Sequence, residues 1–138
     1  MKRILAKTAI TLLAAAVPLA AFAQAAALEG QWRNPKGSVT VKLEPCGGSS
    51  WCGIVVDATE KAKASARKGG TPNLIGTRIL TNLKAAGNGK FKGQVFDPKR
   101  NIRAPATIRV LGPNSIEVRG CAIGGMLLCK EQRWTKVS

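Results

Sequence analysis

Short runs in which hydrophobic and polar residues alternate occupy most of the chain from residue 29 onward. Val39, Val41 and Leu43 alternate with polar residues, and the segments 103–110 and 116–119 repeat this period of two. A period of two is that of a β-strand with one buried face and one face in water. Further strands are expected at 29–34, 51–56, 75–83, 90–96 and 126–136.

Turn-forming residues separate these runs at 87–89, 97–98 and 112–114. Eight short strands with regularly spaced turns predict an all-β fold, either a closed antiparallel barrel or a sandwich. The length of 138 residues fits one such domain, which we assign to residues 24–138.

Residues 57–73 lack the alternation and mix alanines with charged side chains ahead of a Gly-Gly-Thr-Pro sequence. Two structures fit this composition: a short Ala-rich helix, or a basic loop over one mouth of a barrel. A connection of this length is a candidate for function or for disorder.

The last expected strand contains four consecutive polar residues, 130–133, before Trp134. If the face that carries Trp134 is internal, Gln132 and the stem of Lys130 accompany it; otherwise Glu131 and Arg133 face inward. Because buried polar groups need partners, either parity places a polar contact inside the fold. The alternative is a frayed strand edge with these side chains in water.

Residues 1–23 have the composition of a secretory signal peptide. Early cations precede an apolar run from Ala9 to Ala20, and Ala21-Phe22-Ala23 is a typical cleavage pattern. The run is shorter than about 18 residues and contains a proline, which disfavours a membrane anchor. Gln24 follows the cleavage pattern where a lipoprotein would need a cysteine. We therefore expect a periplasmic or secreted bacterial protein with no transmembrane segment in the mature chain.

Charge and cysteine content agree with export. Of the 22 Lys and Arg residues, three lie in the signal peptide, so 19 stand against seven Asp and Glu residues in the mature chain. An even number of cysteines in an exported chain indicates disulfides, and Gly-rich bends lie between the members of each close pair. The predicted disulfides are Cys46–Cys52 and Cys121–Cys129.

The chain contains no histidine, which excludes the usual hydrolytic triads and His-based metal sites. Motifs for phosphate-binding loops and for a nucleophile elbow are also absent. Asp97 precedes Pro98 and is interpreted as a turn former whose carboxylate accepts hydrogen bonds from nearby amides. We expect no enzymatic activity, no metal and no cofactor.

Several short motifs, by their order and spacing, resemble the domain of unknown function 2147 family, whose members are small exported bacterial proteins. The motifs are Gly30-Gln31-Trp32, Cys52-Gly53-Ile54, Leu74-Ile75-Gly76-Thr77, Ile79-Leu80, Gly93 ahead of Phe96-Asp97-Pro98, and Gln132-Arg133-Trp134-Thr135-Lys136. The resemblance covers nearly all of residues 28–137 and implies an eight-stranded, lipocalin-like β-barrel.

The resemblance also implies roles for particular residues. By analogy with lipocalins, Trp32 seals the base of the barrel beneath a cation from the last strand, either Arg133 or Lys136. Asn101 stands where the family pattern has glycine, and it tolerates the same left-handed turn geometry. Lys136 stands where an arginine is common. Ala104 stands where an aromatic residue is expected, which removes a bulky side chain from a barrel-facing strand, so the ligand preference need not be inherited.

Two functions fit these observations. In the first, the barrel carries a small apolar or amphipathic ligand, since an eight-stranded barrel is either filled by side chains or admits one small molecule. The same inward-facing side chains also fit a simply filled core. The expected lining residues are Trp32, Val41, Phe91, Val95, Ile108, Ile116 and Trp134.

In the second, basic loops bind an anionic envelope component or an acidic protein partner, including an envelope enzyme that the protein inhibits. Nucleic acid is disfavoured, because no aromatic residues are interleaved with the cations to stack on bases. The candidate residues for this surface are Lys61, Lys63, Arg67, Lys68, Arg100 and Arg103.

Overall fold

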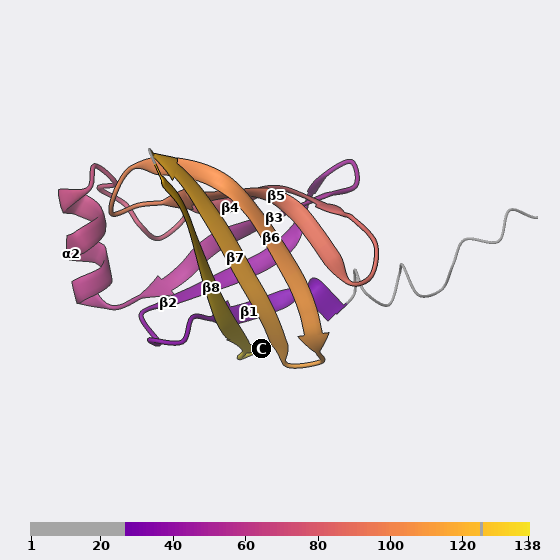
Figure 1. Cartoon of the computed structure of the whole chain (residues 1–138). Coiled ribbons are helices and arrows are strands. Elements are labelled where there is room, and N and C mark those ends of the chain that lie inside the picture. The colour runs from indigo at the N-terminus through magenta and orange to yellow at the C-terminus, as the bar shows by residue number, and fades with distance from the viewer. Residues whose placement is uncertain (1–26, 125) are drawn as a thin grey trace, which may run out of the picture.

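The computed structural model describes residues 27–124 and 126–138, and its strands close into a barrel (Figure 1). The predicted signal peptide at 1–23 lies outside the described residues. Each strand pairs antiparallel with the next, and β8 returns to β1. The strands are β1 (Gly30–Arg33), β2 (Val39–Gly47), β3 (Ser50–Ala58), β4 (Arg78–Ala85), β5 (Lys90–Asp97), β6 (Ile102–Gly112), β7 (Ser115–Gly124) and β8 (Met126–Lys136). The predicted all-β, eight-stranded antiparallel barrel is confirmed, and the sandwich is not formed.

The barrel closes through a short pairing of β1 with β8. Trp32 lies opposite Lys136 and Arg33 opposite Thr135. Beyond this register, the Val137 amide donates a hydrogen bond to the Gln31 carbonyl oxygen at 2.9 Å, which extends the ladder past the end of β8. Closure thus joins β1 to the C-terminal end of β8, where the two strands no longer present open edges to each other.

Most strand boundaries follow the alternation, but β2 and β7 continue beyond the predicted residues, to Gly47 and Gly124, and β4 begins later than predicted. The bounds of β8 agree with the predicted 126–136, whereas β4 begins at Arg78 instead of residue 75. Gly76 has a φ of 89° and its amide donates to the Val55 carbonyl oxygen, while the Thr77 amide donates to Leu74 at 3.1 Å. These bonds make 74–77 a turn, and a positive φ of this kind suits glycine.

The base of the barrel, the end at which Leu28 and the β4–β5 and β6–β7 turns lie, is sealed by Trp32. Its indole Nε1 donates to the Leu28 carbonyl oxygen at 2.9 Å, and both side chains are fully buried. Lys136 Nζ lies 5.6 Å from the centroid of the Trp32 ring, a cation–π distance. Arg133 is exposed and lies opposite Glu117 on β7. Of the two expected cations, Lys136 therefore covers Trp32.

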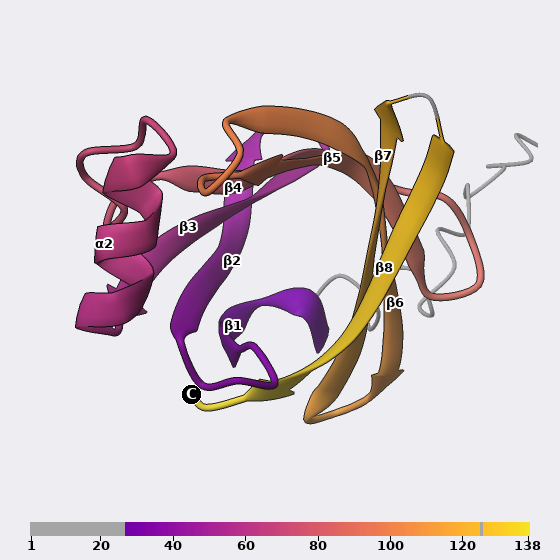
Figure 2. The same ribbon diagram turned by 60° about the vertical axis from the view of Figure 1, so that its left-hand side comes forward.

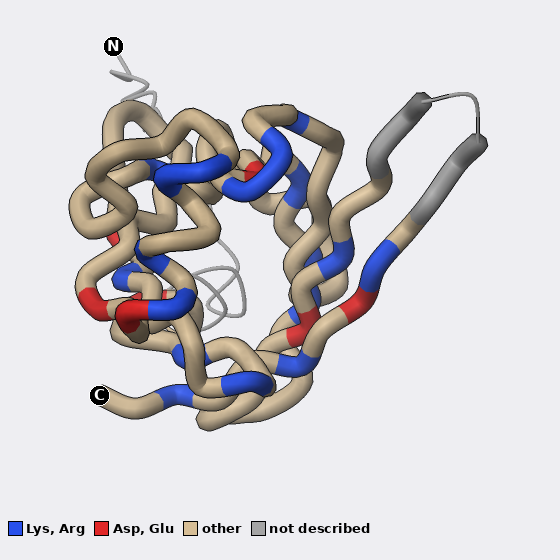
Figure 3. Tube along the Cα trace, turned by 90° about the vertical axis from the view of Figure 1, so that its left-hand side faces the viewer, with Lys and Arg blue, Asp and Glu red and all other residues tan. Residues whose placement is uncertain are grey.

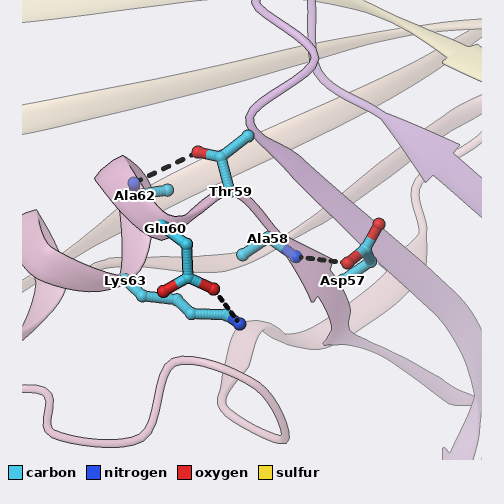
Figure 4. Close-up of polar contacts among 6 residues, drawn as sticks. All are labelled: Asp57, Ala58, Thr59, Glu60, Ala62 and Lys63. Carbon is cyan, nitrogen blue, oxygen red and sulfur yellow. Dashed lines mark hydrogen bonds and ion pairs between the residues drawn. The ribbon is translucent and has the colours of Figure 1, made fainter.

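Residues 57–73 contain a helix, α2 (Glu60–Lys68), so the helical alternative is correct. Thr59 caps its first turn by accepting a hydrogen bond from the Ala62 amide at 3.2 Å, and Lys63 pairs with Glu60 at 3.0 Å (Figure 4). Ala62 and Ala66 are buried and belong to the hydrophobic core. Small side chains on this face let the helix backbone approach the barrel closely.

Helix α2 lies at the end of the barrel opposite the base (Figures 1 and 2). The Thr59 amide donates to Ser38 in the β1–β2 turn at 2.9 Å, and the Thr71 hydroxyl donates to the Pro98 carbonyl oxygen at 3.4 Å. Gly69, the C-cap of the helix, packs so closely on the Pro98 and Lys99 carbonyls that a Cβ atom would collide with them. The helix is thus fixed to two turns of this end.

The predicted disulfides are both present. Cys46–Cys52 links β2 to β3, and Cys121–Cys129 joins directly opposed positions of β7 and β8. The prediction that Asp97 forms a turn is also correct, because its Oδ1 accepts a hydrogen bond from the Lys99 amide at 3.0 Å.

Substituting Gly69 tests how α2 is attached. In Gly69→Ala the new methyl group meets the backbone of the β5–β6 turn, which cannot move like a flexible side chain. We expect the free energy of unfolding to fall by about 1–3 kcal/mol, the usual cost of overpacking, in urea titrations. Gly112→Ala is the matched control, because a Cβ atom there meets nothing within 4 Å. Equal losses in the two variants would contradict the close contact.

Substituting Trp32 tests the seal at the base. Trp32→Phe removes the donor to the Leu28 carbonyl and leaves that buried oxygen without its partner. We expect a loss of about 1–3 kcal/mol in the free energy of unfolding. Trp51→Phe provides the comparison, since Trp51 is only half-buried and its indole donates no hydrogen bond among the described residues. Similar values for both variants would show that the indole hydrogen bond contributes little.

Candidate functional site

The inner face of the barrel is dry over most of its area. Every residue predicted to line the interior belongs to the hydrophobic core or packs against it. Trp32, Val41, Ile108 and Ile116 are 0% exposed, Phe91 is 2% exposed and Trp134 is 6% exposed. A side chain beside a void large enough for water would have accessible surface, so no such void touches the first four. That these side chains contact a ligand stays a prediction. In this structure they pack against one another inside the barrel.

The inner face changes character along β8. Trp134 is buried and lies opposite buried Ile116, which sets the inward parity of this strand. Gln132 and Lys130 follow at steps of two, opposite Val118 and Gly120, and therefore share the inward face. Both are nevertheless exposed. Water therefore reaches the inner wall at the α2 end of the barrel. It is excluded from the inner wall near the base.

Small residues occupy inward positions of β6 and β7 on the same side of the barrel wall. Ala106 lies opposite Gly93 on one side and Gly120 on the other, and Ala104 lies opposite Val95. A Cβ atom on Gly120 would approach Val95 Cγ1 to 3.0 Å, so the valine reaches across β6 to β7. We call the set of Val95, Ala104, Gly120, Lys130 and Gln132 the inner mouth.

The inner mouth combines hydrogen-bonding groups with an apolar wall. Trp134 Nε1 donates to Gln132 Oε1 at 3.0 Å, which orients the amide and leaves its NH₂ group able to donate. Lys130 adds an ammonium group two residues further along the strand. Val95 on β5 and Ala104 on β6 are partly exposed. This arrangement suits a molecule with a hydrogen-bond-accepting or anionic head and an apolar part.

The basic residues predicted for a surface site do not form one unpaired cluster. Lys63 pairs with Glu60, Arg100 pairs with Asp97 at 3.1 Å, and Arg103 lies over the Phe96 ring at 5.0 Å. Lys61, Arg67 and Lys68 are exposed on α2. Figure 3 shows that Lys and Arg positions are distributed around the whole barrel.

A second feature, which periodicity alone did not reveal, lies on the outer wall. Outward side chains of β5, β6, β7 and β8 line a hollow of about 320 Å³, which we call the outer groove. Its members come from different strands, so only the cross-strand register shows that they lie together. They are Lys90, Lys92, Thr107, Arg109, Glu117, Arg119 and Glu131.

The described residues form neither a cluster of metal ligands nor a membrane-spanning helix. Nowhere in 27–124 and 126–138 do three or more Cys, Asp or Glu side chains gather as metal ligands would. Within the same residues, no helix has the length and apolar character needed to cross a membrane.

Comparisons with known proteins agree with the fold. The family described as "Uncharacterized protein conserved in bacteria (DUF2147)" matches residues 30–136. The structure of protein HP1028 from the human pathogen Helicobacter pylori, described as a member of the lipocalin family, superposes with a TM-score of 0.62. The two sequences are 13% identical, and the match covers 80% of this chain and 83% of that one. None of the curated proteins matches the sequence. At this identity the likeness shows a lipocalin-like fold.

Proposed function

The chain belongs to the DUF2147 family of bacterial proteins, and we propose that it is a non-enzymatic binding protein that holds a small amphipathic molecule at the inner mouth of its barrel. The observation that carries this proposal is the change along the inward face of β8. Trp134 is buried, whereas Gln132 and Lys130 are exposed although they face inward. Lipocalin-like barrels are compatible with this use, because their strands surround an interior that opens at one end.

The chemistry of the inner mouth favours an anionic head group. The Lys130 ammonium attracts a carboxylate or similar group, and the Gln132 amide donates a further hydrogen bond. The apolar part of the ligand then contacts Val95 and Ala104, which retain accessible surface. The buried side chains between the inner mouth and the base leave no water-sized space around them. The ligand therefore occupies the α2 end of the barrel and does not reach Trp32.

Export of the protein is part of the proposal. Disulfides such as Cys46–Cys52 and Cys121–Cys129 persist in oxidising compartments such as the periplasm or the extracellular space. Together with the signal-peptide pattern in residues 1–23, they favour a periplasmic or secreted binding protein.

Substituting Lys130 tests the head-group contact. We expect the mature protein to bind decanoate more tightly than decyltrimethylammonium in calorimetric titrations, because only the anionic head group is attracted by Lys130. The alkyl tails of the two amphiphiles have nearly the same length. Lys130→Gln should weaken decanoate binding about tenfold, or ~1.4 kcal/mol, as expected for the loss of one charge-assisted hydrogen bond.

The matched control is Lys84→Gln, which removes the same charge from an exposed lysine of β4 that lies opposite outward-facing Lys92. It should bind decanoate like the unmodified protein. Equal weakening in the two variants would mean that net charge alone attracts the amphiphile. If neither amphiphile binds the unmodified protein, the proposed function is wrong.

A further inference from the structure

The outer groove is built from two parallel rows of side chains that cross the barrel wall. Lys90, Arg109 and Glu117 occupy directly opposed positions of β5, β6 and β7. A second row lies two residues away along each of these strands. It crosses the same wall and continues onto β8. It contains Lys92, Thr107, Arg119 and Glu131.

All of these side chains point away from the core. The residues between the two rows, Phe91, Ile108 and Val118, are buried on the inner face, so their neighbours in each strand lie on the outer face. Adjacent strands are about 4.8 Å apart and alternate residues about 6.7 Å apart. The groove is therefore a wall of regularly spaced charged groups, separate from the inner mouth.

Positive charge exceeds negative charge in this groove. Four cations stand against two carboxylates. Within the described part of the chain, the groove residues make one salt bridge. It joins Arg119 Nε to Glu131 Oε1 at 3.6 Å. Arg119 and Glu131 are each about half exposed. The pair orients one guanidinium group across the groove and leaves its other donors available.

The cations on neighbouring strands face one another. Lys90 lies directly opposite Arg109, and Lys92 lies directly opposite Lys84 of β4. Like charges at directly opposed positions destabilise a sheet. An anion bound between them would relieve this repulsion, so the groove offers both attraction and a compensating gain in stability.

We propose that the outer groove binds an anionic saccharide unit, a sugar ring that carries a phosphate or carboxylate group. The Arg109 and Arg119 guanidinium groups match the planar, two-oxygen geometry of such anions, and Lys92 adds a point charge. The Glu117 and Glu131 carboxylates accept hydrogen bonds from sugar hydroxyls, and the Thr107 hydroxyl can donate or accept.

The residues that line the groove favour an anionic saccharide over other anions. A bare phosphate offers few protons to Glu117 and Glu131, which would repel it, whereas a sugar offers several hydroxyl donors. No aromatic residue lines the groove, so it provides no platform on which a nucleobase could stack. The volume of about 320 Å³ suits a small molecule or one unit of a longer glycan.

The first test compares four probes by NMR titration of the mature protein: glucose 1-phosphate, glucuronate, inorganic phosphate and glucose. We expect both anionic sugars to bind with dissociation constants in roughly the millimolar range or tighter, and to shift amide signals of β5, β6, β7 and β8. Inorganic phosphate should bind more weakly, and glucose should not bind measurably. The two anionic sugars together distinguish a phosphate source from a carboxylate source.

The second test uses variants of exposed residues. Lys92→Gln combined with Arg109→Gln should weaken binding of the anionic sugars at least about fivefold, since each removes a charge-assisted contact. Lys61→Gln combined with Lys68→Gln removes the same charge from α2 and should leave their affinity unchanged. Glu117→Gln should reduce the preference for glucose 1-phosphate over inorganic phosphate, because a charged hydroxyl acceptor becomes a weaker neutral one and a charge that repels phosphate is removed.

Two results would overturn the inference. Equal affinity of the unmodified protein for glucose 1-phosphate and inorganic phosphate would show attraction by charge alone. An equal loss in the α2 variant would show that the anion has no defined site on β5 to β8. The outcome is independent of the proposed amphiphile site, because the Lys92 and Arg109 variant should bind decanoate normally.

Discussion

The short pairing of β1 with β8 is the contact on which the rest of the molecule depends. It joins the ends of the sheet through Trp32 opposite Lys136 and a further hydrogen bond from Val137 to Gln31. Without it the sheet would have two open edges, and its inner face would not be shielded from water. Closure also brings the Lys136 ammonium over the Trp32 ring, so the residues that join the sheet also seal its base. The distinction between an inside and an outside wall follows from this pairing.

Once the barrel is closed, the period of two along β8 gives its two faces different chemistry. Trp134, Gln132 and Lys130 face inward, whereas Arg133 and Glu131 face outward next to Glu117 and Arg119. A run of polar residues that looks uniform in the sequence is therefore divided between an inner mouth and an outer groove. A ligand at one surface meets none of the side chains that serve the other, because the backbone of the strand lies between them.

The sequence predicted what depends on local alternation and missed what depends on pairing. The all-β pattern, both disulfides and the bounds of β8 were correct, because period-two patterns and close cysteine pairs are local signals. The choice of a closed barrel over a sandwich came from the family resemblance and was also correct. The start of β4 was wrong, because the turn at 74–77 is set by hydrogen bonds to β3. The parity of β8 could not be chosen until the structure buried Trp134 opposite Ile116. The outer groove needed the register of four strands, which no single segment encodes.

The boundary between the dry and wet parts of the interior follows from side-chain size. Trp32, Phe91 and Trp134 supply the volume that fills the barrel toward its base, and large aliphatic residues complete the packing. Toward α2 the inward positions of β6 and β7 are Ala104, Ala106 and Gly120, which contribute little side-chain volume. Val95 spans part of this region, and Gln132 borders it while its amide bonds to the Trp134 indole. Gln132 and Lys130 are exposed at this end, so water reaches them, and the proposed ligand would take the place of that water.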